Sequence, residues 1–174
     1  IYFIRCNAGN IPNLLHNLLS MRTEFASKVG FSLSPVEESF LNKIPSEILT
    51  NIVFEPMKQE IWAKTPINLC LFFAKAAFEE RFFEKFKMQK KAFFSTINFQ
   101  LTSNEQDFLL NNSMIQIENS ANFVRLKDTL LLRIFPLLSN EEILVYLEIS
   151  RVPFQNPYPN KDNFIDALLG HRSR

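Results

Sequence analysis

The stretch at residues 44–52, IPSEILTNI, is the part of this sequence that best indicates its fold. Pro45 opens it, and proline is accepted in the first turn of a helix because the first amides of a helix lack intrahelical acceptors and the fixed φ of the ring suits the helix. Glu47 follows two residues later, where a carboxylate meets the positive end of the helix dipole. The sequence therefore predicts a helix that begins at this proline.

The apolar residues of this predicted helix are spaced at helical intervals. Ile48 pairs with Ile52 and Leu49 with Val53, each pair four residues apart. At about 100° per residue, the two pairs form neighbouring stripes that together are wider than one packing surface needs. We therefore expect one stripe to pack in the chain's own core and the other to contact a partner.

The composition extends this helical prediction to the whole chain. Of the 174 residues, 47% are hydrophobic and 21% are charged, which is typical of a globular protein that can bury a sizeable core. Sheet proteins of this size need many turn glycines, and this chain has only Gly9, Gly30 and Gly170. We expect an all-α fold, a compact multi-helix domain.

Charge and cysteine content limit the classes of partner and compartment. The formal net charge is +1, which gives no electrostatic reason to expect a nucleic-acid partner. The apolar opening at residues 1–4 ends at Arg5 and is too short for a signal segment or a membrane span. The two cysteines, Cys6 and Cys70, exclude a disulfide framework, so we expect an intracellular, reducing compartment.

Several helix starts carry a capping box, in which a serine or threonine is followed three residues later by glutamate. Such boxes stand at residues 34–37, 102–105 and 139–142. The segment at 67–97, rich in phenylalanine, is predicted to be one central helix packed on both flanks, with a break near Lys90 as the alternative. Helices are predicted near 11–28, 35–42, 46–54, 57–63, 67–97, 103–111, 120–136, 139–150 and 161–169. The prolines within 151–162 predict a loop there.

Few residues of the sequence offer catalytic or metal-binding chemistry. The only histidines are His16 and His171, there are four aspartates, and neither a glycine-rich phosphate loop nor a paired cysteine motif is present. We therefore expect no catalytic residues, no cofactor and no metal site, and interpret the chain as something other than an enzyme. Buried Cys70 is expected to serve as a small core residue.

Residues 44–86 resemble an F-box in both of its halves. In the first half, Ile44 takes the place of the family's leucine, and the other signature positions match as they stand: Pro45, Glu47, Ile48, Leu49 and Ile52. The second half of an F-box has Asp-Leu, an apolar run, and a small residue followed by Lys or Arg ahead of an aromatic residue. The residues here that are similar to it, in the same order, are Asn68, Leu69, residues 71–73, Ala74, Lys75 and Phe78. Three features depart from the family: the spacer at 54–66 is longer, Asn68 replaces aspartate, and Phe78 lies one residue late.

The resemblance implies an adaptor that docks on Skp1 of a cullin ubiquitin ligase and recruits a target. The implied partner-binding residues are Ile44, Pro45, Ile48, Leu49, Ile52, Leu69 and Phe72. The F-box-like unit would lie in a helical region at 1–97, and the helices of 98–174 would recruit the target, as a separate region or packed with the first as one domain. The abundant Asn, Ile, Lys and Phe suggest an AT-rich genome, which together with this motif suggests a bacterial effector secreted into a host cytosol.

The alternative interpretation is a helical protein-interaction or structural domain unrelated to ubiquitination. An ordinary helix with proline in its first turn gives the same pattern at residues 44–52. The two interpretations differ in what the apolar stripes contact. An adaptor needs part of the segment exposed to its partner, whereas the alternative allows the chain to cover all of it.

Overall fold

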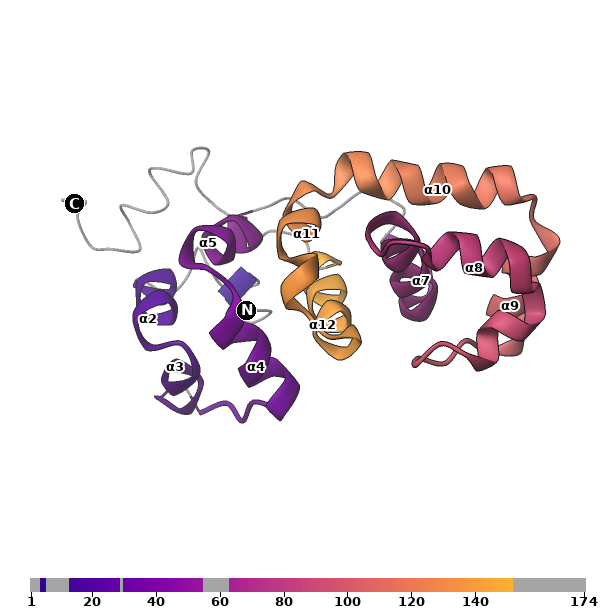
Figure 1. Cartoon of the computed structure of the whole chain (residues 1–174). Coiled ribbons are helices and arrows are strands. Elements are labelled where there is room, and N and C mark those ends of the chain that lie inside the picture. Colours follow the sequence, from indigo (N-terminus) through magenta and orange to yellow (C-terminus); the bar gives the residue numbers. More distant parts are fainter. Residues whose placement is uncertain (1–3, 6–12, 29, 55–62, 152–174) are drawn as a thin grey trace. The chain divides into compact units, whose positions relative to one another are not determined.

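The computed structural model describes residues 4–5, 13–28, 30–54 and 63–151, and every regular element within these ranges is a helix (Figure 1). This confirms the predicted all-α fold. The chain divides into two compact units, one formed by Ile1–Lys58 with Glu148–Arg174 and the other by Gln59–Leu147. The expected regions 1–97 and 98–174, separate or packed as one domain, stay a prediction. The predicted helices at 57–63 and 161–169 lie wholly or largely outside the described residues.

The described helices of the first unit are short and follow one another closely. They are α2 (Leu14–Met21), α3 (Thr23–Lys28), α4 (Pro35–Lys43) and α5 (Ser46–Phe54). α2 contacts α3 and α5, and α3 contacts α4. The single helix predicted at 11–28 is wrong, because the chain breaks at Arg22, whose φ is 51°. The helices predicted at 35–42 and 46–54 are confirmed.

The second unit is built around the phenylalanine-rich segment. Its elements are α7 (Ile67–Phe78), α8 (Phe82–Gln89), the 3₁₀ helix η1 (Lys90–Ser95), α9 (Ser103–Asn111), α10 (Met114–Lys127), α11 (Thr129–Ile134), the 3₁₀ helix η2 (Phe135–Leu137) and α12 (Asn140–Ser150), whose last residues belong to the first unit. α10 packs on α7, and α8 contacts both α7 and η1 (Figure 1).

The long helix predicted at 67–97 is wrong, and the reason is the packing of its aromatic rings. The chain turns after α7 and again at Lys90, with left-handed φ values of 65° at Arg81 and 53° at Lys90. In a straight helix, Phe72 and Phe82 would lie about 15 Å apart along the axis. The turn brings their ring centroids to 5.3 Å. The alternative of a break near Lys90 is confirmed, and the turn at Arg81 is additional.

Four phenylalanine rings close a cycle in the core of the second unit. Phe72 contacts Phe82 at 5.3 Å and Phe86 at 5.2 Å between ring centroids, and Phe93 contacts Phe82 at 5.0 Å and Phe86 at 5.8 Å. All four contacts have the edge-on geometry that the charge distribution of aromatic rings favours. The predicted core role of these aromatic residues is thereby confirmed, since all four are buried.

Side-chain caps begin five of the described α-helices, which are α4, α9, α10, α11 and α12. The boxes predicted at Ser34, Thr102 and Ser139 are present, each with a reciprocal pair of hydrogen bonds to the glutamate three residues later. A fourth box joins Ser113 to Gln116 and begins α10. The helix predicted at 120–136 is therefore wrong at its start. It is also broken at Asp128, whose side chain accepts a hydrogen bond from Leu131 N and so caps α11.

Candidate functional site

The first half of the F-box-like segment lies on α5 and at the corner that precedes it. Ile44, Ile48, Leu49 and Ile52 are all buried, and Val53 is buried with them. Pro45 is exposed, as are Ser46 and Glu47 in the first turn of the helix. Both apolar stripes of α5 are therefore covered by the chain itself.

Arg22 fixes the corner from which α5 begins. Its Nη1 donates hydrogen bonds to the carbonyl oxygens of Leu41, at 2.9 Å, and Ile44, at 2.8 Å, at the end of α4. Its Nη2 donates to Ser46 Oγ at 2.9 Å, at the start of α5. A cation that binds carbonyls at the end of a helix also complements the negative end of its dipole. Arg22 thus holds Pro45 on the surface between two fixed helix ends.

The remaining predicted partner-binding residues belong to the other compact unit. Leu69 and Phe72 lie on α7 and are both buried. Phe72 belongs to the ring cycle, with none of its side chain exposed. The structure therefore places five predicted residues in the first unit and two in the second, and only Pro45 of the seven is exposed.

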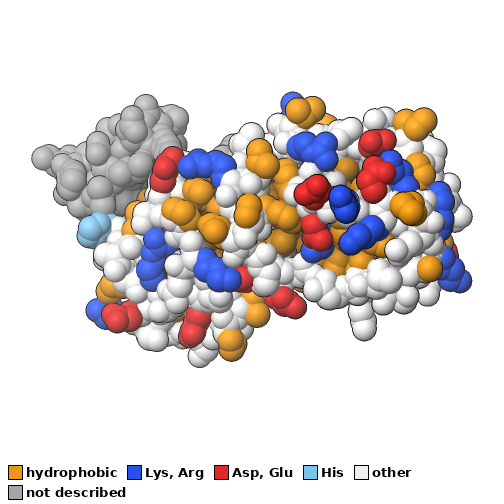
Figure 2. Space-filling view, viewed as in Figure 1, with side chains coloured by type: hydrophobic (Ala, Val, Ile, Leu, Met, Phe, Trp, Pro, Cys, Tyr) orange, Lys and Arg blue, Asp and Glu red, His pale blue; other side chains and the backbone are white. Residues whose placement is uncertain are grey.

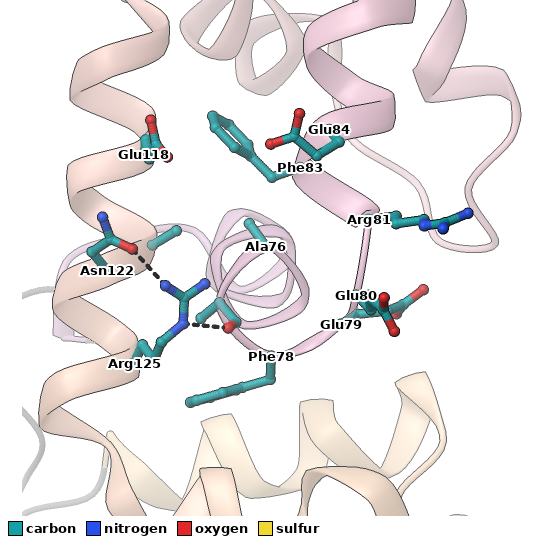
Figure 3. A pocket seen from close by; sticks show the side chains of 12 residues that line it. Ala76, Phe78, Glu79, Glu80, Arg81, Phe83, Glu84, Glu118, Asn122 and Arg125 are labelled. Carbon is teal, nitrogen blue, oxygen red and sulfur yellow. Dashed lines mark hydrogen bonds between the residues drawn. The ribbon is translucent and has the colours of Figure 1, made fainter.

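A cavity of about 290 Å³ lies where the second unit turns between α7 and α8, facing α10 (Figure 3). Arg125 of α10 reaches across it, donating from Nε to Ala77 O at 2.8 Å and from Nη1 to Asn122 Oδ1 at 2.7 Å. The first of these hydrogen bonds satisfies a carbonyl at the end of α7, where helices lack their own donors. The cavity wall therefore includes a packing contact between α7 and α10.

Two of the carboxylates that line this cavity pair with nearby lysines. Glu79 pairs with Lys75 at 2.6 Å and Glu84 with Lys87 at 2.8 Å. The hydrogen bond to Glu84 raises the pKa of Lys87 above its ordinary value. Figure 2 shows acidic and basic side chains intermixed on the surface over this part of the second unit. The cavity is best explained as the space left by the turn between α7 and α8.

Two further cavities have more apolar walls. One, of about 140 Å³ in the first unit, includes Leu18, Phe25 and Phe31 in its lining. The other, of about 450 Å³ in the second unit, lies between the start of α7 and α9 and includes Leu69, Phe73 and Phe108. Among the described residues, no group of three His, Cys, Asp or Glu side chains could hold a metal ion.

The outward side of α10 exposes two large apolar side chains, which the sequence analysis missed. Ile117, Ala121 and Val124 are buried on one side of the helix, whereas Ile115 is 71% exposed and Leu126 is 75% exposed on the other. In Figure 2, apolar side chains interrupt the charged surface over the region that α10 occupies in Figure 1. The helix was predicted to begin at residue 120, which left its first turns unassigned. The capping box at Ser113 is the signal that could have revealed it.

Comparisons of the chain with known protein families, with curated proteins and with solved structures give no match. In the described part of the chain, no helix combines the length and apolar character needed to cross a membrane.

Proposed function

We propose that this chain is a helical protein-interaction domain whose contact surface is the outward side of α10. The observation that carries the proposal is the exposure of Ile115 and Leu126 on a helix whose opposite side is already packed. An amphipathic surface helix exposes polar side chains, and a helix with apolar residues on both sides is suited to a second packing partner. Two apolar side chains on one side of a surface helix are candidates for contact with a partner.

The distribution of exposed large apolar side chains supports a contact surface in the second unit. Among the described residues, the large hydrophobic side chains that are exposed lie in this unit with the single exception of Phe31. They are Met88, Phe108, Ile115, Phe123, Leu126, Leu132 and Leu137. Scattered single residues of this type are ordinary on a surface, so the proposal depends on the pair that shares one side of α10.

Site-specific photo-cross-linking tests this proposal. A benzophenone amino acid at position 126 should trap a protein in lysate of cells that express the chain, and the same group at exposed Lys85 on α8 should not. The band from position 126 should disappear when Ile115→Asp is added, because the aspartate places a charge in the proposed contact. Equal cross-linking from positions 126 and 85, or none from either, would contradict the proposal.

Docking on Skp1 is a second candidate function, favoured by the position of Pro45. This proline is exposed at the start of α5, beside Glu47 in the first turn, at the sequence positions where the F-box resemblance implies adaptor contact. Buried Ile48, Leu49 and Ile52 would then support the helix and leave the contact to its first turn. In this function the helices after residue 98 would recruit the target, in an effector that acts inside a host cell.

Gel filtration of the chain with purified Skp1 tests the second candidate. A stable adaptor complex should co-elute at micromolar concentrations, and Pro45→Glu should abolish it while leaving the helical circular dichroism unchanged, since Pro45 is exposed. If the two proteins elute separately, or if Pro45→Glu co-elutes as well as the unmodified chain, Skp1 docking through this surface is wrong.

A further inference from the structure

The cavity between the start of α7 and α9 has the size of a small-molecule site. Its volume is about 450 Å³, and all of its lining residues belong to the second unit. Leu69 and Phe73 of α7 line it and are buried, whereas Phe108 of α9 is 47% exposed. The cavity therefore offers apolar surface on which the body of a small organic molecule could pack.

A buried carboxylate lines the same cavity. Glu105 lies in the first turn of α9, and only 7% of the residue is exposed. Its Oε1 accepts a hydrogen bond from Thr102 N at 2.9 Å, within the capping box. No group among the described residues donates to Oε2, and this atom is not sealed inside the protein. Because a buried charge is costly without hydrogen bonds, the cavity is suited to a ligand that brings a donor to Oε2.

A hydroxyl group from α10 adds a second acceptor to the cavity lining. The Oγ of Ser120 donates to Gln116 O at 3.1 Å within its own helix. This hydrogen bond uses the single hydroxyl proton, so the lone pairs of Oγ are left for a donor. An ammonium group carries three N–H donors and no acceptor. The acceptors of Glu105 and Ser120 therefore match a protonated amine.

Charges of both signs border the cavity, and burial decides between them. Lys64 lines it but is exposed, so water and salt screen its ammonium group. The start of α7, at Thr65 and Pro66, adds the positive end of a helix dipole, which corresponds to less than one full charge. Glu105 carries a full negative charge in a buried position, where the lower dielectric strengthens its attraction for a cation. A ligand group inside the cavity therefore meets a negative charge most strongly.

We propose that this cavity binds a small organic amine. Its protonated amino group donates to Glu105 and Ser120, and its aromatic or branched aliphatic body packs on Leu69, Phe73 and Phe108. A carboxylic acid of the same shape would place its charge against Glu105, and a neutral alcohol would lose the charge-assisted hydrogen bond. The site is independent of the proposed function, because the two exposed apolar side chains of α10 do not line the cavity.

Three probes of similar shape test the class of ligand. Phenethylamine, phenethyl alcohol and hydrocinnamate are each titrated to about 10 mM into the isotope-labelled full chain in phosphate buffer, and amide resonances are followed by NMR. Phenethylamine should shift the amides of Leu69, Phe73 and Phe108 with a dissociation constant on the order of 1 mM. The other two probes should bind at least about 10-fold more weakly. No saturable shift with phenethylamine, or binding of another probe as tight as that of the amine, would overturn the proposal.

Substitution of two carboxylates on α9 tests the role of Glu105. Glu105→Gln removes the charge and keeps an acceptor for Thr102 N. Gln116 accepts from Ser113 N in the same way at the start of α10, so α9 should keep its cap. This variant should bind phenethylamine at least about 10-fold more weakly. Asp107→Asn is the matched control, because Asp107 is exposed on α9 and does not line the cavity, and it should leave the affinity unchanged. Equal weakening by both variants would show an effect of net charge alone and overturn the proposal.

Lys64→Gln tests the sign of the ligand charge without touching a buried residue. Lys64 is exposed, so the substitution should leave the fold intact. Removal of a cation at the cavity should leave phenethylamine binding unchanged or tighten it, because like charges repel. If Lys64→Gln instead weakens phenethylamine binding more than about 2-fold, the ligand is held by contacts other than those of a cation with Glu105, and the proposal is wrong.

Discussion

Replacement of Phe72 by alanine should strongly destabilise the second unit. Phe72 is fully buried, and its ring lies 5.3 Å from Phe82, 5.2 Å from Phe86 and 6.0 Å from Phe73 between centroids. Truncating a buried phenylalanine costs about 3 to 5 kcal/mol, because transfer free energy is lost and a cavity remains. Three edge-on ring contacts place Phe72 toward the upper part of this range, so we expect a loss of about 4 kcal/mol.

Urea unfolding followed by far-ultraviolet circular dichroism measures this effect. With a slope of about 2 kcal/mol per molar urea, the midpoint of the transition to which the second unit contributes should fall by about 2 M. Phe72→Leu keeps most of the volume and should lose about 1 to 1.5 kcal/mol. Phe108→Ala, which truncates a ring that is 47% exposed, is the surface control and should change the midpoint much less.

The measurement also separates packing from docking at Phe72. If Phe72→Ala unfolds with a loss below about 1 kcal/mol, the ring cycle does not stabilise the unit and the reasoning from its geometry is refuted. If Phe72→Leu keeps its stability and loses Skp1 binding, the side chain reaches a partner in spite of its burial. We expect Phe72→Leu to leave any binding unchanged.

Substitutions at three further residues test the contacts that set the helix ends. Tyr146→Phe removes the hydroxyl that donates to Asp128 Oδ1 at 2.7 Å in a buried site, so the free energy of unfolding should fall by about 1 to 3 kcal/mol in urea titrations, and an unchanged midpoint would refute the contact. Ser113→Ala should lower it by about 1 kcal/mol by removing the cap of α10, whereas Ser113→Asp should retain most of it. Arg22→Ala should cost about 1 to 3 kcal/mol, since the ends of α4 and α5 lose three hydrogen bonds. Faster amide hydrogen exchange should accompany the loss at Ile44 and Leu49, whose N–H groups donate to Phe40 O and Pro45 O at these helix ends; unchanged exchange there would contradict the role of Arg22.

Local sequence was sufficient for the features that depend on a few consecutive residues. The boxes at Ser34, Thr102 and Ser139 were predicted because a capping box involves only four residues, all of which the sequence shows together. The start of α5 after Pro45 was predicted for the same reason. The scarcity of glycine, together with the spacing of apolar residues, was sufficient for the all-α fold.

Whether the apolar residues of the candidate sites are buried depends on residues that are distant in the sequence. The two apolar stripes of α5 were visible in the sequence, but their spacing does not say what covers them. The structure buries both stripes and leaves Pro45 exposed. On α10 the opposite occurs, because Ile115 and Leu126 remain exposed although their residue types favour burial. Periodicity identifies an apolar side of a helix, and only the packed neighbours decide whether that side is buried.

The sequence by itself determined that the chain is helical and where several helices begin, since propensity and capping act within one or two turns. Only the tertiary structure decided where the long aromatic segment turns. A left-handed residue costs roughly 1 to 2 kcal/mol, so local preference favours a continuous helix through Arg81 and Lys90. Folding back at these positions lets Phe72, Phe82 and Phe93 meet, and burial of large rings outweighs that local cost.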